Sequence, residues 1–239
     1  MESPATLDII IPCYDPRPGW EKVLSESISE IGKALPENVL QSVILVNDGS
    51  NTGVTEEGID VLGKDLSGIK LIEYRKNMGK GFAVRKGVRS SEADIRIYTD
   101  IDMPYENAAI VDFYGMLSAG EADIVVTDRG DTYYRSLSFF RRMLSRSLRW
   151  LNGFLFGLRI KDTQGGLKGF NANGREVFLR TRINRYLFDL EFIQLASAAG
   201  LRLQAMDVKL KPGILLPAPG PLILFREMHN LILLLIRKR

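Results

Sequence analysis

The sequence IRIYTDIDMPY, residues 95–105, decides the fold, because it ends an apolar run in two aspartates that lie one residue apart. Near-continuous apolar runs are typical of strands that are buried on both faces of a parallel sheet. Two neighbouring carboxylates repel each other and are costly to desolvate, so a positive charge is expected beside Asp100 and Asp102. We therefore expect a buried strand whose carboxyl end carries a charged site.

Other runs of β-branched and aliphatic residues flank this one, namely LDIIIPCY at 7–14, SVILVNDGS at 42–50, KLIEYR at 70–75 and DIVVTD at 123–128. Segments of helical length lie between or after them, at residues 20–35, 79–88, 107–119, 137–156 and 189–199. Strand followed by helix, repeated, predicts an α/β fold with a mostly parallel sheet and right-handed crossovers.

The chain of 239 residues is 45% hydrophobic, which is enough for one large core. We find no repeat, low-complexity tract or linker, and predict one domain over residues 1–212. Residues 213–239 have short apolar runs broken by prolines or by REMHN and end in RKR. This pattern predicts amphipathic helices at a membrane surface, although a helix packed on the core is the alternative. No signal peptide or complete transmembrane helix is expected.

Composition excludes several classes of site. The net charge of +3 is only mildly basic and does not suggest nucleic-acid binding. Cys13 is the only cysteine, so no internal disulfide can form, and a reducing compartment fits. His229 is the only histidine, which excludes the usual Cys/His zinc sites and histidine-based catalytic triads.

Polar clusters follow three predicted strands, namely PCYD at 12–15, NDGS at 47–50 and DID at 100–102. Ligands of open α/β sheets bind outside the carboxyl ends of the strands. Because side chains alternate along a strand, Asp100 and Asp102 are expected on one side, where they would hold Mg²⁺ or Mn²⁺ and, through it, a diphosphate. The alternative is an Asp-rich turn that caps the helix beginning near Asn107.

The segment NMGKGFAVRKG, residues 77–87, follows a strand and opens a helix. Its glycines permit close approach of the backbone, and Lys80 is within reach of a phosphate at this helix terminus. The segment lacks the G-K-[ST] of a P-loop and the third glycine of a dinucleotide fingerprint. A plain junction between loop and helix is the alternative.

A basic segment, RGDTYYRSLSFFRRMLSRSLRW at residues 129–150, interleaves arginines with aromatic and aliphatic residues. Arg142, Arg146 and Arg149 share one helix face, and arginine suits phosphate. The pattern predicts a basic amphipathic helix at a membrane surface. A solvated helix face or RNA binding are the alternatives.

Four segments, in their order and spacing, resemble the family 2 glycosyltransferases, which have the GT-A fold: IIIPCYD, ILVNDGS, NMGKGFAVRKG and TDID. The later segments KDTQGGLKGF and LFDLEFIQLA are similar to the polyprenyl-phosphate sugar transferases, above all to the dolichyl-phosphate β-glucosyltransferase branch. The resemblance covers roughly residues 7–210 and is more specific for sugar transfer than for the sugar or the acceptor.

The resemblance implies roles for individual residues. It places the nucleotide sugar at Pro12, Tyr14, Asp15, Asp48, Lys80, Asp100, Ile101, Asp102 and Gln164, with Asp100 and Asp102 as metal ligands. It places lipid-phosphate contacts at Arg129, Arg141, Ser145 and Lys168, and catalytic carboxylates at Asp162 and Asp189. An N-cap is the alternative role for Asp189. Mannose synthases often carry Gln where Pro104 stands here, and Gln164 is the residue that would compensate.

The implied activity is inverting, Mg²⁺- or Mn²⁺-dependent transfer of a hexose from a nucleoside-diphosphate sugar to polyprenyl phosphate at the cytoplasmic face of a membrane. UDP-glucose is the favoured donor, while GDP-mannose or a saccharide acceptor stay open. A sugar-phosphate nucleotidyltransferase would carry a basic glycine-rich loop where PCYDPRPGW stands. A non-catalytic nucleotide-sugar binding module would be expected to have lost the charged site residues that this chain retains. The oligomeric state is left open.

Overall fold

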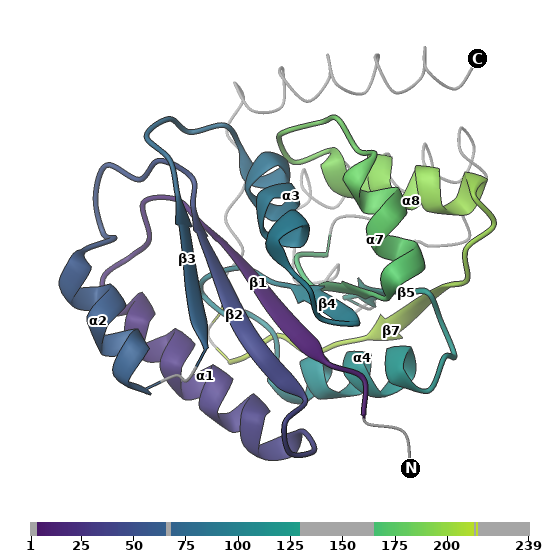
Figure 1. Cartoon of the computed structure of the whole chain (residues 1–239), viewed down its shortest axis with the longest axis horizontal. Helices are drawn as coiled ribbons and strands as arrows, with labels where there is room; N and C mark the ends of the chain where they lie inside the picture. The colour runs from purple at the N-terminus through teal and green to yellow at the C-terminus, as the bar shows by residue number, and fades with distance from the viewer. Residues whose placement is uncertain (1–3, 66–67, 130–164, 213, 215–239) are drawn as a thin grey trace.

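A computed structural model describes residues 4–65, 68–129, 165–212 and 214 (Figure 1). These residues form one seven-stranded sheet with helices on both faces. The strands are β1 (Leu7–Cys13), β2 (Leu40–Asn47), β3 (Ile69–Glu73), β4 (Ile95–Tyr98), β5 (Ile124–Asp128), β6 (Lys168–Phe170) and β7 (Leu203–Asp207). The helices are α1 (Trp20–Ala34), α2 (Glu56–Asp65), α3 (Lys80–Ser90), α4 (Ala108–Ser118), α7 (Ala172–Leu179) and α8 (Phe188–Ala198).

The sheet has the strand order β3-β2-β1-β4-β6-β5-β7. Every neighbouring pair is parallel except the two that involve β6, which runs antiparallel to β4 and to β5. The predicted α/β fold with a mostly parallel sheet is confirmed. The short antiparallel β6 and the edge strand β7 were not predicted.

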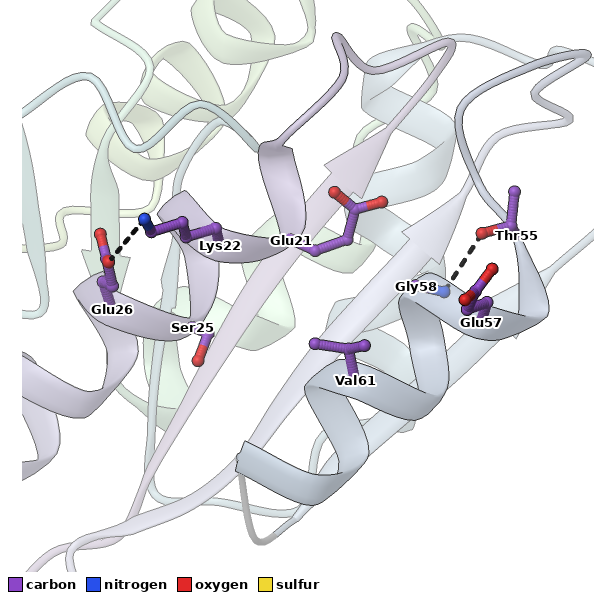
Figure 2. A pocket seen from close by; sticks show the side chains of 8 residues that line it. All are labelled: Glu21, Lys22, Ser25, Glu26, Thr55, Glu57, Gly58 and Val61. Atoms are coloured by element: carbon purple, nitrogen blue, oxygen red, sulfur yellow. Dashed lines mark hydrogen bonds and ion pairs between the residues drawn. The ribbon is translucent and has the colours of Figure 1, made fainter.

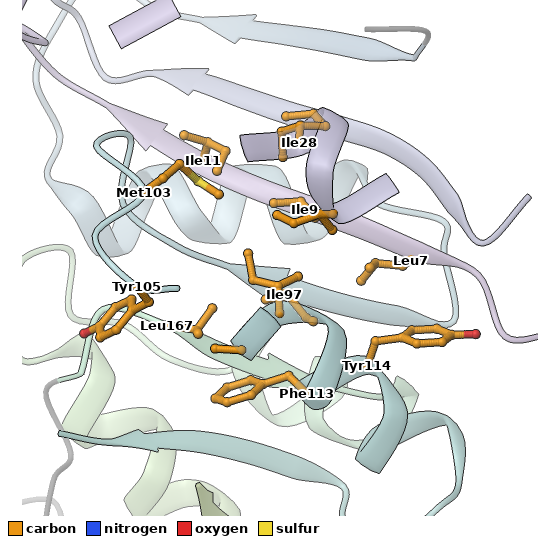
Figure 3. Close-up of a cluster of buried hydrophobic side chains, with 14 of the residues drawn as sticks. Leu7, Ile9, Ile11, Ile28, Ile97, Met103, Tyr105, Phe113, Tyr114 and Leu167 are labelled. Atoms are coloured by element: carbon orange, nitrogen blue, oxygen red, sulfur yellow. The ribbon is translucent and has the colours of Figure 1, made fainter. Parts of the chain in front are cut away.

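Strand β1 lies inside the sheet, between β2 and β4, and all seven of its residues are buried. Ile9 and Ile11 pack into the cluster on the α1 and α4 side, while Ile10 packs into the cluster on the α3 side. Figure 3 shows the first of these clusters, with Ile97 of β4 near Ile9 of β1 and Phe113 of α4 beyond Ile97. Burial on both faces explains why the sequence of this strand is apolar apart from Asp8, which accepts a hydrogen bond from the Ser42 hydroxyl.

The helices form two layers, with α1, α2 and α4 on one face of the sheet and α3, α7 and α8 on the other (Figure 1). In α1 the buried stripe Trp20, Leu24, Ile28 and Ile31 follows the helical period. Its C-cap, Leu35, is extended, as expected of a residue before proline. On the other face, Phe170 of β6 stacks on Phe178 of α7 with ring centroids 5.2 Å apart.

A buried carboxylate joins the start of β5 to the start of β7. Asp123 accepts hydrogen bonds from the backbone N of Arg202 at 3.0 Å and from its Nε at 3.1 Å. It also accepts one at 3.0 Å from Nδ2 of Asn171, which precedes α7. Arg202 lowers the pKa of Asp123 well below the usual aspartate range by bonding to the ionised form.

The Asp123→Asn variant should lose about 2 kcal/mol of unfolding free energy at pH 7, because an amide cannot accept all of these bonds. The folded-state pKa of Asp123 is depressed, so its contribution is present above the unfolded value near pH 4 and is lost as pH falls through the folded value. The stability gap between wild type and variant should therefore shrink on acidification. Urea unfolding at pH 7 and pH 3 measures it, with the exposed neighbour change Glu121→Gln as control. Equal stability at pH 7 would contradict this role.

Several predicted features lie outside the described residues, namely the helical stretch 137–156 and almost all of the tail 213–239, with the domain boundary that precedes it. Within the described part of the chain, no helix combines the length and the apolar character needed to cross a membrane.

Candidate active site

The two aspartates of the DID segment lie in a turn beyond the end of β4. The strand ends at Tyr98, and the backbone N of Met103 donates to the carbonyl of Asp100 at 3.0 Å. Met103 has a φ of 44°, which completes the turn. The alternation argument used to place Asp100 and Asp102 together therefore does not apply, because a turn positions them instead of a strand. The capping alternative also has no support, since Asn107 is the N-cap of α4.

The two carboxylates are close enough to influence each other. Loss of hydration and then the charge of Asp100 raise the pKa of Asp102 above the usual aspartate value. Lys80, the first residue of α3, forms an ion pair with Asp100. Although burial lowers the pKa of Lys80, Asp100 and Asp189 raise it, so the ammonium form is favoured. The positive charge expected beside the aspartates is thus supplied, within the described residues, by α3.

Asp48 of the NDGS segment is buried and holds the loop before α3. Its Oδ1 accepts the backbone N–H of Met78 at 2.7 Å, and its Oδ2 accepts that of Gly79 at 2.8 Å. The side chain of Asn77 donates to Oδ2 at 3.1 Å. Asp48 therefore fixes the segment that presents Lys80 to Asp100.

The residues after β1 are fixed to the loop after β2. Asp15, with a φ of 42°, accepts the backbone N–H groups of Asn51 at 2.7 Å and of Thr52 at 3.1 Å. Tyr14 is 47% exposed at this rim, whereas Pro12 is buried within β1. Tyr14 and Asp15 are thus brought to the same end of the sheet as Asp48, as predicted for nucleotide-sugar residues.

Gly166 packs directly against Asp100, and its neighbour Gly165 packs against Thr127. The backbone N of Gly166 donates to the hydroxyl of Tyr105 at 2.9 Å, and Thr127 donates its hydroxyl to the carbonyl of Leu167 at 2.6 Å. A Cβ on Gly166 would overlap Oδ2 of Asp100. The turn at residues 165–167 therefore forms one wall around the Asp100 carboxylate.

Lys168 and Asp189 form a buried ion pair behind this turn. The Lys168 side chain is 0% exposed and the Asp189 side chain 7%, with 2.9 Å between Nζ and Oδ1. Lys168 also donates to the carbonyl of Gly165 at 2.6 Å, and the Tyr98 hydroxyl donates to Asp189. Asp189 is the second residue of α8 rather than its N-cap. The structure brings these two predicted residues together in the core and not at the surface.

Gly166→Ala should lower turnover about a hundred-fold, because the new methyl group displaces Asp100 from its position beside Lys80. Overpacking should also cost about 1–3 kcal/mol of stability. Initial-rate assays and thermal unfolding measure the two effects. Gly115→Ala in α4 is the matched control, since nothing lies within 4 Å of a Cβ there. Wild-type activity in Gly166→Ala would show that Asp100 need not stay in place.

The remaining predicted residues are only partly described. Ile101 lies in the turn between the two aspartates, and Arg129 directly follows β5 and is half-buried. Asp162, Gln164, Arg141 and Ser145 lie outside the described residues.

Sequence reasoning missed the contribution of Tyr98, Tyr105, Thr127 and the loop between α7 and α8. A tyrosine at the end of a buried strand was a usable signal, because a buried hydroxyl needs a hydrogen-bond partner. The loop gave no local signal, since its contacts with α3 join residues about a hundred positions apart.

The donor atoms fit a hard divalent cation. Mg²⁺ and Mn²⁺ are bound through one or two carboxylates together with substrate phosphates and water. Asp100 and Asp102 provide the carboxylates, and Gly166 leaves the Asp100 carboxylate the space that a side chain would fill. No cluster of three or more acidic, His or Cys residues suited to a metal occurs among the described residues.

A groove between α1 and α2 is a separate feature (Figure 2). Glu21, Glu26 and Glu57 line it, together with Lys22 and Val61. Three carboxylates repel a diphosphate, and none of the predicted site residues reaches the groove. It is therefore not the donor site.

The sequence of the chain matches known proteins. The model of the family described as "Glycosyl transferase family 2" matches residues 8–204. A dolichyl-phosphate beta-glucosyltransferase of Drosophila melanogaster is 27% identical over 220 residues, which is 85% of this chain and 66% of that protein. The protein of the same name from Homo sapiens is 25% identical over 202 residues, or 80% of this chain and 62% of that protein. The chain thus spans slightly less than two thirds of these relatives.

Solved structures share the fold. Glucosyl-3-phosphoglycerate synthase from Mycobacterium tuberculosis, in complex with Mn²⁺, UDP and glucosyl-3-phosphoglycerate, superposes with a TM-score of 0.63. It is 17% identical, and the match covers 97% of this chain and 78% of that one. The same enzyme in complex with Mn²⁺ and UDP-glucose also has a TM-score of 0.63. At this identity the likeness supports the GT-A fold alone.

Proposed function

Because the chain belongs to glycosyltransferase family 2, we propose that it transfers glucose from UDP-glucose to a polyprenyl phosphate with inversion at the anomeric carbon. The observation that carries the proposal is the pair of aspartates beyond β4, with Lys80 beside them, in a chain whose curated relatives are named dolichyl-phosphate beta-glucosyltransferases. That pair lies beyond the carboxyl end of β4, and ligands of open α/β sheets generally bind outside the carboxyl ends of the strands.

Asp100 and Asp102 would hold Mg²⁺ or Mn²⁺, which when bound acts as a Lewis acid on the diphosphate. Side chains of the protein provide the remaining charge and hold the site in position. Lys80 supplies a positive charge beside Asp100, and Asp48 keeps the loop before α3 in place by accepting its backbone N–H groups. Fixed charges aimed at the place where negative charge develops lower the barrier.

The acceptor needs little activation. A lipid monophosphate has a second pKa of about 6 and is largely ionised at pH 7. Its oxygen forms a bond to the anomeric carbon while the bond from that carbon to the diphosphate oxygen breaks, and the electron pair leaves with UDP. The site must therefore hold two anions close together, which favours arginine and lysine around it.

Roles are proposed for the other residues too. Pro12, Tyr14, Asp15 and Ile101 border the nucleotide sugar, and Arg129 is proposed as a lipid-phosphate contact. Asp189 is proposed to act by holding Lys168 and, through it, the turn at residues 165–167, rather than by touching the substrate. The residues outside the described part keep the roles proposed from sequence, with Asp162 as a catalytic carboxylate, Gln164 at the donor, and Arg141 and Ser145 at the lipid phosphate.

We further propose that residues 1–212 form the catalytic domain and that residues 213–239 attach it to the cytoplasmic face of a membrane. The basic character of residues 129–150 supports attachment to a membrane surface.

The test is incubation with Mn²⁺ and radiolabelled UDP-glucose, with and without polyprenyl phosphate. Lipid-dependent release of UDP, with label recovered in the lipid fraction, is the expected result. GDP-mannose in place of UDP-glucose tests the sugar and the base. Pyrophosphate exchange would instead reveal a nucleotidyltransferase, and binding without turnover a binding module; either result would reject the proposal.

A further inference from the structure

The loop between α7 and α8, residues 180–187, lies against the N-terminal end of α3 (Figure 1). The backbone N of Phe82 donates to the carbonyl of Asn184 at 3.2 Å. A Cβ on Gly79 would lie 2.5 Å from that carbonyl oxygen, and a Cβ on Gly81 would lie 2.6 Å from the carbonyl oxygen of Ile183. The glycines expected to permit close approach thus make room for the backbone of this loop.

Two charged side chains fix the loop from the neighbouring helices. Arg85 of α3 donates to the carbonyl of Ile183 at 2.8 Å and to the side chain of Asn184. Glu191 of α8 accepts the backbone N–H groups of Arg182 at 2.8 Å and of Ile183 at 2.7 Å. The position of the loop backbone is therefore set before any substrate binds, which lowers the entropy cost of binding.

The loop carries Arg185 to the donor end of the sheet. Its Cγ lies 3.0 Å from the place that a Cβ on Gly79 would take, next to Lys80. Asp15 raises the pKa of the Tyr14 hydroxyl and the charge of Arg185 opposes that rise, so the guanidinium is near Tyr14 as well. Arg185 thus lies between the rim after β1 and the start of α3.

Arg185 is half-buried, and although its carbonyl accepts the backbone N–H of Phe188 at 3.2 Å, its guanidinium makes no hydrogen bond or ion pair with any residue in the described part of the chain. Partial burial of a guanidinium without a counter-charge costs free energy. The other groups at this point are engaged, because Lys80 is paired with Asp100 and the amides of Met78 and Gly79 are bound by Asp48. An anion that enters here therefore meets Arg185 as a cation with no protein partner among the described residues.

We propose that Arg185 binds a phosphate group of the reactants and that the rigid loop exists to place it there. The inference rests on the proposed function for the presence of phosphates at this end of the sheet. A guanidinium offers several N–H donors in one plane, which matches phosphate oxygens. The phosphate belongs either to the donor diphosphate or to the acceptor monophosphate.

The test compares wild type with Arg185→Gln by calorimetric titration in the presence of Mn²⁺. The probes are UDP, inorganic pyrophosphate and uridine. The expected result is roughly tenfold weaker binding of UDP and pyrophosphate with unchanged affinity for uridine. Arg182→Gln removes the same charge from an exposed position of the same loop and should leave all three affinities unchanged.

Steady-state kinetics separate the two sources of phosphate. If UDP and pyrophosphate bind as before but the half-saturating concentration of polyprenyl phosphate rises about tenfold, Arg185 serves the acceptor phosphate. If neither changes, or if uridine weakens as much as UDP, the proposal is overturned. Absence of lipid-dependent transfer by a wild-type protein that binds UDP would reject the proposed function. If Arg185→Gln then still weakens UDP binding, the assignment of Arg185 to the diphosphate stands. Wild type that binds none of the probes would reject both.

Discussion

Turnover by the Asp102→Asn variant should fall about a thousand-fold, because an amide replaces one of the two carboxylates that the proposed cation requires. Mn²⁺ binding should weaken in parallel, since neutral amide oxygen is a poorer ligand for a hard cation than carboxylate. Lipid-dependent release of UDP measures the first effect, and electron paramagnetic resonance of free Mn²⁺ measures the second.

The fold of this variant should remain intact. Loss of hydration and the Asp100 charge raise the pKa of Asp102, so its ionised form is disfavoured in the folded protein. Removing that charge relieves repulsion, and the midpoint of thermal unfolding without metal should not fall. A large loss of turnover without loss of stability would mark Asp102 as a functional residue and not a structural one.

Asp112→Asn is the control for this experiment, because it removes a carboxylate from an exposed position of α4. It should leave turnover and Mn²⁺ affinity at wild-type values. The metal assignment is wrong if Asp102→Asn keeps both as well. Weak Mn²⁺ binding with normal turnover would show instead that a cation binds here without serving the reaction.

The sheet was predictable wherever strands are buried on both faces. β1, β2 and β4 have largely apolar sequences for that reason, and their positions follow from the sequence alone. β6 was missed because it has three residues and begins with a lysine. The charge of Lys168 is compensated by Asp189, which is twenty-one positions further along the chain. No local pattern reveals a partner at that distance.

The candidate site was predictable in place but not in detail. Polar clusters after β1, β2 and β4 do meet at one end of the sheet, as the parallel order of the strands requires. The turn at Met103 and the ion pair between Lys80 and Asp100 were not readable, since both depend on packing of separate segments. The same holds for Arg185, whose position depends on Arg85, one hundred positions away.

Lys168→Met should cost about 3–5 kcal/mol of unfolding free energy, which is the expected penalty for leaving Asp189 charged and buried without its cation. Tyr98 cannot compensate, because burial and then the Asp189 charge raise its pKa well above the usual tyrosine value and it stays a neutral donor. The carbonyl of Gly165 loses its hydrogen bond as well, so the turn against Asp100 should loosen. Urea unfolding measures the stability, and donor KM against kcat measures the effect on the site.

The double variant Lys168→Met/Asp189→Asn distinguishes charge from packing. It should regain most of the lost stability, because no buried charge remains unpaired and the Tyr98 hydroxyl still has an oxygen to donate to. Its turnover should stay low, since the turn at residues 165–167 is still not held by Lys168. Equal stability of the single and double variants would contradict the ion pair as the source of the penalty. Full turnover in the double variant would show that neither Asp189 nor Lys168 serves the reaction, and that the pair stabilises the fold alone.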